Sequence, residues 1–268
     1  MTVYLVGAGP GDPGLITVRG LELIRGADAI VYDVLASDEL LEEASESCLL
    51  FSREGMGQEA INELLVSLGQ TFERVVRLKG GDPLLFARGH EEAVVLEEAG
   101  IGYGFVPGVS ALTAVPASAG IPLTRRGVSA QVTVISGHSA SGEELDYDAL
   151  AAAAGTLVVF MGLRALGELA ERLIAAGKGE DTPVAVISGG TTAAQQTVVA
   201  PLGEIAGRAA VLVSPALVVI GDVASFSREP VAGACIGVWR SSQNEDCVAG
   251  PRSAARCCVL GSAKSHRS

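Results

Sequence analysis

The chain has 268 residues, enough for one large or two modest domains, and 49% of its residues are hydrophobic, which excludes a disordered chain. Its 34 glycines and 4% aromatic residues fit a close-packed α/β protein whose turns lie near a ligand. The net charge of −12, from 19 basic and 31 acidic residues, argues against a nucleic-acid partner.

Membrane and export signals are not expected. The longest apolar runs, such as residues 156–161, are far shorter than the ~20 residues that cross a bilayer. The chain enters a strand pattern at residues 2–6, without the basic start and apolar stretch of a secretory signal. We therefore expect no membrane span and a cytoplasmic protein.

The cysteines are concentrated near the end of the chain. Cys48 stands alone, and the other four are Cys235, Cys247, Cys257 and Cys258. The body of the chain therefore has no paired framework for disulfides. A zinc site in the tail would need two close pairs or histidines at ligand spacing, and only one adjacent pair with a distant His266 is present. No metal site is predicted.

The first part of the chain has a βαβ pattern that predicts a parallel sheet. The expected strands cover residues 3–6, 29–32, 75–79 and 103–106. The expected helices cover residues 15–25, 38–45, 58–68 and 91–98. Each strand ends in a loop, and open α/β sheets bind ligands at the carboxyl ends of their strands.

The second part is also predicted to be α/β, after a small-residue stretch at 109–120 that we interpret as a hinge. Strands are expected at 131–136, 156–161, 184–188, 196–199 and 216–220, and helices at 163–176 and 202–208. Some connections are too short for a crossover helix, so antiparallel pairs are expected. The predicted division is a first lobe at 1–109, a second lobe at 110–226 and an irregular, loosely attached tail at 227–268.

The loop from Gly7 to Asp12 follows a strand and precedes a helix, as in a dinucleotide-binding fingerprint. That fingerprint needs a small residue three places after its second glycine, where this chain has Asp12. A carboxylate at a helix entry suits a cap and occupies the place of a pyrophosphate. The loop is explained equally well as a tight turn between a strand and a helix.

The segment Arg77-Leu78-Lys79-Gly80-Gly81-Asp82-Pro83 is more informative. Two glycines and a carboxylate at the end of a strand let the backbone approach a ligand and offer it an acceptor. Alternation along the strand places Arg77 and Lys79 on the same face. These two cations lie either on a solvated edge or on one wall of an anion site.

Three motifs together indicate a family: RLKGGDP at 77–83, VPG at 106–108 and GIPLT at 120–124. With the first glycine loop, they resemble the S-adenosylmethionine-dependent uroporphyrinogen-III C-methyltransferases over about residues 3–223. Related precorrin methyltransferases and diphthine synthase generally lack the RLKGGDP and GIPLT pair. The resemblance implies two α/β lobes, the first mostly parallel and the second mixed, with a cofactor crevice between them.

The same resemblance implies an activity, a partner state and a set of site residues. The activity is two methyl transfers to uroporphyrinogen III, giving precorrin-2 for sirohaem or cobalamin biosynthesis, by a homodimer. Asp33 corresponds to the family's proton acceptor, and Arg53 stands in place of its proton-donor lysine, in a segment that is shorter than usual. The implied contacts to S-adenosylmethionine are Pro10, Gly80, Gly81, Asp82, Leu85, Ser110, Ala111, Met161 and Gly190.

Uroporphyrinogen carries eight carboxylates, so its site needs cations even in an acidic protein. The available cations near the motifs are Arg77, Lys79, Arg88, Arg125 and Arg126. We expect Arg125 and Arg77 to contribute first, because they lie within or next to the family motifs.

Three alternatives stay open at the level of sequence. A methyltransferase acting on a later precorrin shares most of the features. A nicotinamide-dependent oxidoreductase is supported by Gly7 and Gly9 but opposed by Asp12. A catalytically weak tetrapyrrole-binding protein is suggested by Arg53, because arginine is a poor proton donor.

Overall fold

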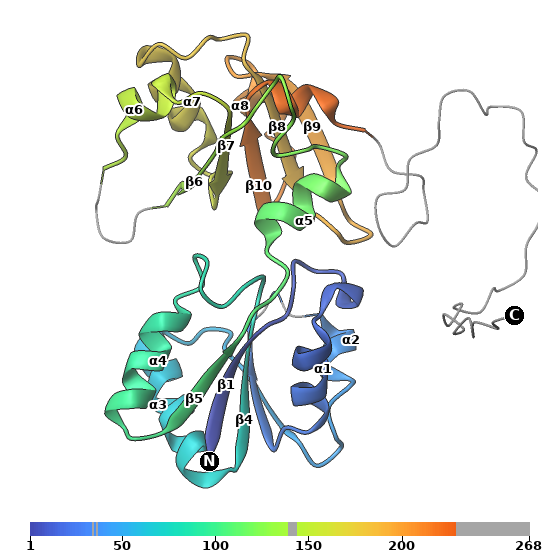
Figure 1. Ribbon diagram of the computed structural model, residues 1–268, viewed down its shortest axis with the longest axis vertical. Coiled ribbons are helices and arrows are strands. Elements are labelled where there is room, and N and C mark those ends of the chain that lie inside the picture. Colours follow the sequence, from blue (N-terminus) through green and yellow to red (C-terminus); the bar gives the residue numbers. More distant parts are fainter. Residues whose placement is uncertain (34, 36, 139–143, 229–268) are drawn as a thin grey trace, which may run out of the picture.

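The protein forms two lobes, one above the other along its long axis, in a computed structural model that describes residues 1–33, 35, 37–138 and 144–228 (Figure 1). The cysteines of the tail and nearly all of the tail prediction lie outside these residues. Within the described part, no helix is long and apolar enough to cross a membrane.

The first lobe is built on a five-stranded parallel sheet in the order β3-β2-β4-β1-β5. The expected parallel sheet is confirmed. One face packs against α1 and α2 and the other against α3 and α4, each over a separate apolar core. The elements are β1 (Thr2–Gly7), α1 (Val18–Arg25), β2 (Ala29–Tyr32), α2 (Asp38–Leu41), β3 (Leu49–Ser52), α3 (Gln58–Thr71), β4 (Arg74–Lys79), α4 (Gly89–Glu98) and β5 (Gly102–Val106).

Several details of this lobe differ from the sequence-based prediction, and the expected helix at 38–45, for example, ends at Leu41. The edge strand β3 was not among the expected strands, because its four residues are mostly exposed and show no buried pattern. The expected helix at 15–25 begins later, since Pro13–Leu15 form a short 3-10 helix and the Thr17 hydroxyl caps α1 by accepting the Gly20 N–H at 3.1 Å.

The second lobe contains a mixed sheet in the order β6-β7-β10-β8-β9, as expected. β6 and β7 are parallel, and the other neighbouring strands are antiparallel. Helices α6, α7 and α8 pack on one face, and α5 with the 3-10 helix η2 packs on the other. The elements are α5 (Ala111–Ser118), β6 (Val132–Ser136), α6 (Tyr147–Ala152), β7 (Thr156–Phe160), α7 (Leu166–Ala175), β8 (Pro183–Ser188), β9 (Gln196–Pro201), α8 (Ile205–Arg208), β10 (Ala216–Ile220) and η2 (Asp222–Phe226).

The small-residue stretch that we interpreted as a hinge is the helix α5, which lies where the two lobes meet (Figure 1). Ser110 caps it, because its hydroxyl accepts the Leu112 N–H at 3.1 Å. Val115 of α5 is buried against the second sheet. Our proposed division after residue 109 therefore assigns α5 to the second lobe.

Candidate active site

Three glycine-containing segments of the first lobe meet at the carboxyl ends of β1 and β4. Gly81 donates its N–H to the carbonyl oxygen of Gly9 at 2.7 Å. A Cβ on Gly108 would lie 2.1 Å from the Gly81 oxygen, and one on Gly7 would lie 2.5 Å from Gly108 Cα. The backbones approach so closely that side chains are excluded at these positions.

The carboxylate of Asp82 ties this assembly together. Its Oδ1 accepts the Leu84 N–H at 2.9 Å, and its Oδ2 accepts the Gly108 N–H at 3.1 Å. The Leu85 N–H, in turn, donates to the Asp82 carbonyl oxygen at 3.4 Å. Asp82 therefore orders the two loops, a role that sequence reasoning, which made it an acceptor for a ligand, had missed.

Gly81 lies on the side of this assembly that faces the second lobe. Its φ of +67° is in the left-handed region that favours glycine. A Cβ added there would lie 3.8 Å from the backbone nitrogen of Ala111, the first residue of α5. Gly81, Ser110 and Ala111 thus border the same space, and the missing side chain lets a ligand reach main-chain groups.

A second contact between the lobes forms next to Pro10. The Asp12 N–H donates to Thr191 Oγ1 at 3.2 Å, and the Thr191 N–H donates to Gln195 Oε1 at 2.8 Å. Gly190 lies beneath α5, since a Cβ there would be 2.5 Å from Val115 Cγ1. The loop after β8 is thereby held against the first glycine loop.

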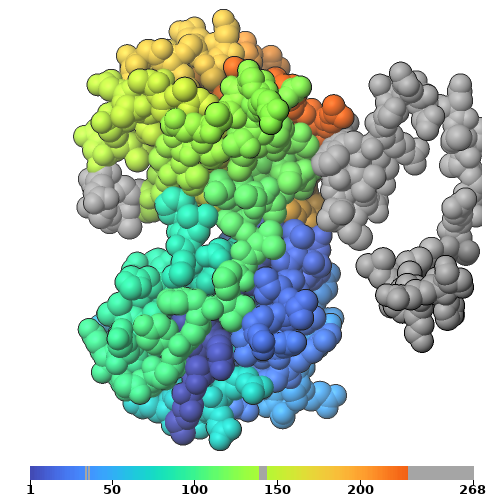
Figure 2. Space-filling view, viewed as in Figure 1, coloured from blue at the N-terminus to red at the C-terminus, as the bar shows by residue number. Residues whose placement is uncertain are grey.

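Aromatic side chains join the lobes at another point. The ring centroids of Phe86, before α4, and Phe160, at the end of β7, are 5.1 Å apart. Met161 follows Phe160 and is exposed. Figure 2 shows a gap between the lobes that a segment rising from the first lobe crosses on the visible face.

Strained backbone is concentrated in these segments. The described non-glycine residues with positive φ are Phe86 at 54°, Arg88 at 58°, Met161 at 53° and Thr191 at 70°. Such conformations each cost about 1–3 kcal/mol and persist where the surrounding structure enforces them, commonly at ligand sites. Their position between the lobes supports the crevice as the functional site.

Asp33 lies directly after β2, at the same edge of the sheet. Its N–H donates to the Leu78 oxygen at 3.1 Å, so the backbone continues the strand ladder. Its Oδ1 accepts a hydrogen bond from Arg77 Nη2 at 2.5 Å and lies 3.6 Å from Arg53 Nη1. Its Oδ2 lies 3.4 Å from the Gly80 nitrogen, and the side chain is 17% exposed. The structure therefore brings together Asp33, Arg53 and the Gly80 loop.

Arg77 and Lys79 share one face of β4, as alternation predicts, but that face is covered by α3 and α4. Both side chains are buried. Glu92 Oε1 accepts hydrogen bonds from Lys79 Nζ at 2.8 Å and from Arg77 Nε at 3.3 Å. Burial lowers the pKa of Lys79, the charge of Arg77 lowers it further, and Glu92 acts in the opposite direction. The expectation that these cations bind substrate is corrected: they are internal ion-pair partners.

The other expected cations are divided between the two ends of the molecule. Arg88 is exposed beside Phe86 and pairs with Glu91 at 2.5 Å. Arg125 bridges to Ser129, whose hydroxyl lies 2.9 Å from that of Thr156, so it lies at the start of β7, the opposite end of that strand from Phe160. Its guanidinium stacks 3.9 Å from the Phe226 ring centroid. Arg126 follows it in the same exposed turn. The structure therefore does not bring Arg125 and Arg126 to Asp33.

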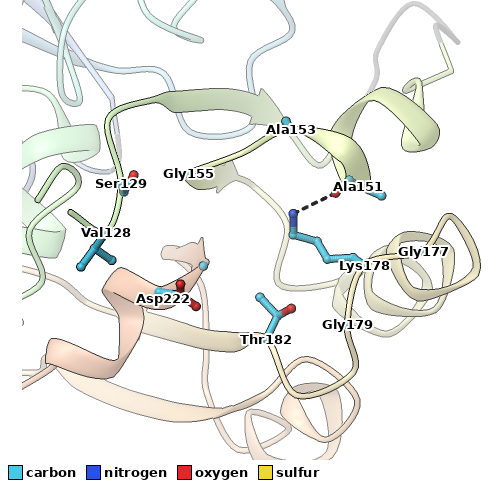
Figure 3. Close-up of a pocket in the computed structure, with 11 residues that line it drawn as sticks. Val128, Ser129, Ala151, Ala153, Gly155, Gly177, Lys178, Gly179, Thr182 and Asp222 are labelled. Atoms are coloured by element: carbon cyan, nitrogen blue, oxygen red, sulfur yellow. Dashed lines mark hydrogen bonds between the residues drawn. The ribbon is translucent and has the colours of Figure 1, made fainter. Parts of the chain in front are cut away.

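A pocket of about 280 Å³ also lies at this distant end (Figure 3). Lys178 extends along it and donates to the Ala151 oxygen at 3.3 Å, and the carboxylate of Asp222 lies on another wall. None of the site residues expected from the sequence lines this pocket. The part of the chain that the structure describes also contains no group of three His, Cys, Asp or Glu side chains that could hold a metal.

Known proteins with related sequences act in tetrapyrrole metabolism. The sequence profile of the Tetrapyrrole (Corrin/Porphyrin) Methylases matches residues 2–206. Siroheme synthase 1 of Yersinia enterocolitica is 46% identical over 234 residues, 85% of this chain and 50% of the relative. Siroheme synthase 2 of Aeromonas hydrophila is 44% identical over 237 residues. The chain thus spans about half the length of the curated relatives it matches.

Solved structures give a match over nearly their whole length. Uroporphyrin-III C-methyl transferase from Thermus thermophilus, complexed with S-adenyl homocysteine, is 35% identical with a TM-score of 0.75, covering 84% of this chain and 99% of that one. Cobalt precorrin-4 methyltransferase is 28% identical with a TM-score of 0.76, covering 83% of this chain and 95% of that one.

Proposed function

The chain belongs to the tetrapyrrole (corrin/porphyrin) methylases, and on this premise we propose that it methylates uroporphyrinogen III at two carbon atoms to give precorrin-2. It is a methyltransferase whose methyl donor is S-adenosylmethionine. One observation supports this substrate most directly. Asp33 and Arg53 lie together beside the Gly80 loop, at the edge of the first sheet that faces the second lobe.

The residues that would hold the methyl donor come from both lobes. The open backbone at Gly81 and the packed glycines around it fit a ligand that binds main-chain groups. When bound, S-adenosylmethionine supplies an electrophilic methyl group on a sulfonium. The proposed contacts are Pro10, Gly80, Gly81, Asp82, Leu85, Ser110, Ala111, Met161 and Gly190.

Asp33 is the proposed base. Each transfer forms a bond between the methyl carbon and a ring carbon, breaks the methyl–sulfur bond, and releases a proton from the substrate. Oδ1 of Asp33 is already bonded to Arg77, whereas Oδ2 has only a long contact to the Gly80 N–H. We therefore assign proton acceptance to Oδ2. Alignment of the substrate and exclusion of water supply much of the remaining rate.

The substrate carboxylates need cations that reach the crevice, and Arg53 and Arg88 are the proposed anchors. Both are exposed in part and lie on segments that border the crevice. Arg164, three residues after Met161, is a third candidate that the sequence analysis did not single out. It is exposed, and none of the ion pairs formed among the described residues involves it.

Product mass is the direct test of this function. The purified chain is incubated with S-adenosylmethionine and either uroporphyrinogen III or a later precorrin, and the mass of each product is measured. A gain of two methyl groups on uroporphyrinogen III is expected. Turnover of the later precorrin alone would instead establish the methyltransferase alternative, which the likeness to cobalt precorrin-4 methyltransferase supports. Tight binding of uroporphyrinogen III without turnover would favour a binding protein.

We also propose that the chain acts as a homodimer in the cytoplasm. The lobes contact each other at separate points, such as the Asp12–Thr191 hydrogen bond and the Phe86–Phe160 ring contact, and a second copy would fix their relative position. Sedimentation at micromolar concentration is expected to give twice the mass of the 27.2 kDa chain. Cell fractionation with an antibody against the chain tests the location.

A further inference from the structure

The first lobe contains a buried charged cluster made of Arg77, Lys79 and Glu92, which ends at the carboxylate of Asp33. The rest of this face of the sheet is apolar and packs against α3 and α4. Buried ion pairs are frequently no more stabilising than apolar residues of the same volume, because desolvation offsets their attraction. Stability alone therefore does not account for the cluster.

Every nitrogen of the Arg77 guanidinium has a partner. Nη2 donates to Asp33 Oδ1 at 2.5 Å, and Nε donates to Glu92 Oε1 at 3.3 Å. Nη1 donates to the carbonyl oxygens of Leu78 at 3.1 Å and of Val31 at 3.4 Å. A planar guanidinium bonded on all sides has one orientation, and that orientation sets the position of Oδ1 of Asp33.

Glu92 completes this arrangement from α4. Its side chain is fully buried, and its Oε1 accepts hydrogen bonds from Arg77, from Lys79 and from Gln58 Nε2 at 3.2 Å. Among the residues that the structure describes, its Oε2 has no hydrogen-bond partner. An unsatisfied buried oxygen is unfavourable, so this carboxylate is not arranged for maximum stability.

We propose that Glu92 is a positioning residue for methyl transfer. It holds Arg77 in the orientation that directs Asp33 Oδ2 toward the crevice, and Lys79 balances its charge. This inference rests on the proposed function of Asp33 as the base. It assigns a role in the reaction to a side chain that does not reach the substrate.

The test is a double-mutant cycle between Glu92→Gln and Asp33→Asn, measured as transfer of labelled methyl groups to uroporphyrinogen III. In the wild-type background, Glu92→Gln is expected to lower kcat about 10- to 100-fold, because a displaced catalytic group loses alignment. The KM for the substrate and the affinity for S-adenosylhomocysteine are expected to stay within about threefold of their wild-type values, since the Glu92 side chain is fully buried. In the Asp33→Asn background, the same change is expected to have almost no further effect.

Glu98→Gln is the matched control, because Glu98 is an exposed carboxylate on the same helix. It is expected to leave kcat unchanged. If Glu92→Gln does not fold, Gln58→Ala removes one donor to Glu92 at the half-buried start of α3 and is expected to lower kcat about two- to fivefold.

The outcomes separate the two proposals. An equal loss from Glu92→Gln in both backgrounds would show a merely structural role and overturn this inference, while leaving Asp33 as the base. Normal kcat in Glu92→Gln or, where that variant does not fold, in Gln58→Ala would also overturn it. Normal kcat in Asp33→Asn would remove the base and the positioning role together.

Discussion

The two lobes place polar groups in their interiors in different ways. The buried charged residues described by the structure, Arg77, Lys79 and Glu92, all lie in the first lobe. The buried polar residues of the second lobe are the hydroxyl side chains of Ser129, Thr156 and Ser188. Since buried charges need fixed partners, the first lobe holds its carboxylates rigidly, whereas the second is a mainly apolar support.

This difference suggests that the two lobes have different roles in the reaction. The first lobe carries the proposed base on a charged framework, and the second contributes backbone loops with strained residues such as Met161 and Thr191. Changes to the charged groups that hold Asp33 should therefore affect chemistry, and changes to the loops that border the crevice, in either lobe, should affect binding. The following variants test that division, from the largest expected effect to the smallest.

Asp33→Asn should produce the largest loss. The change keeps the shape of the side chain and removes its basicity, so kcat should fall about 100- to 10,000-fold. Affinity for S-adenosylhomocysteine, measured by calorimetry, should be retained. Near-normal turnover would show that Asp33 is not the base, and it would contradict the catalytic role proposed for the first lobe.

Gly81→Val should act on binding although it lies in the first lobe. A β-branched residue at φ +67° adds backbone strain, and its side chain blocks the ligand from the main-chain groups. A loss of about 2–3 kcal/mol of binding free energy corresponds to roughly 100-fold weaker binding. Calorimetry with S-adenosylhomocysteine measures the affinity. Gly57→Ala is the control, since a Cβ there meets nothing within 4 Å. Unchanged affinity in Gly81→Val would reject the proposed position of the cofactor.

Arg53→Ala should raise the KM for uroporphyrinogen III about 10-fold, because a charge-assisted contact to a carboxylate is lost. Arg53→Lys should keep activity similar or raise it, since lysine can donate a proton and arginine practically cannot. Steady-state kinetics with both variants separates anchoring from proton donation. An inactive Arg53→Lys variant would show that the alignment of this short segment with the family is wrong.

Thr191→Val tests the contribution of the second lobe. It removes the oxygen that accepts the Asp12 N–H while keeping the size of the side chain. A lost hydrogen bond of about 1 kcal/mol should weaken S-adenosylhomocysteine binding about fivefold with little change in kcat. Thr197→Val, on the exposed edge strand β9, serves as the control. A large fall in kcat alone would contradict the division between the lobes.

The smallest expected effect is on the pH dependence of stability, and Lys79→Met tests it, in addition to the constant cost of leaving the buried Glu92 without one of its cations. The pKa of Lys79 is lowered in the folded state, so the unfolded chain binds more protons between that pKa and 10.5. The wild type therefore gains stability as the pH rises through this range, with a slope of at most about 1.4 kcal/mol per pH unit. The variant lacks this gain. Urea unfolding of both proteins between pH 7 and 10.5 measures the difference, and a constant difference would contradict the assignment.

Local sequence determined most of the element types and the loops, but it did not predict the strand β3 or the helix α5. Glycine clusters after apolar runs identify strand ends, because only these residues permit close backbone approach, and their order carries the family resemblance. The βαβ pattern predicted the parallel first sheet, and the short connections predicted the antiparallel pairs of the second sheet. Alternation correctly placed Arg77 and Lys79 on one face, since side-chain direction in a strand is a local property.

Only the tertiary structure decided what covers each face. Arg77 and Lys79 are buried because α3 and α4 pack over them, and Glu92 reaches them from 13 to 15 positions along the chain. Arg125 looked like a site residue because of its motif, yet its turn precedes β6 and lies beside the start of β7, at the end of the second sheet far from Asp33. The spacing of charges in a sequence does not reveal which helix packs on which face of a sheet. That packing determines whether a cation contacts the substrate or an internal carboxylate.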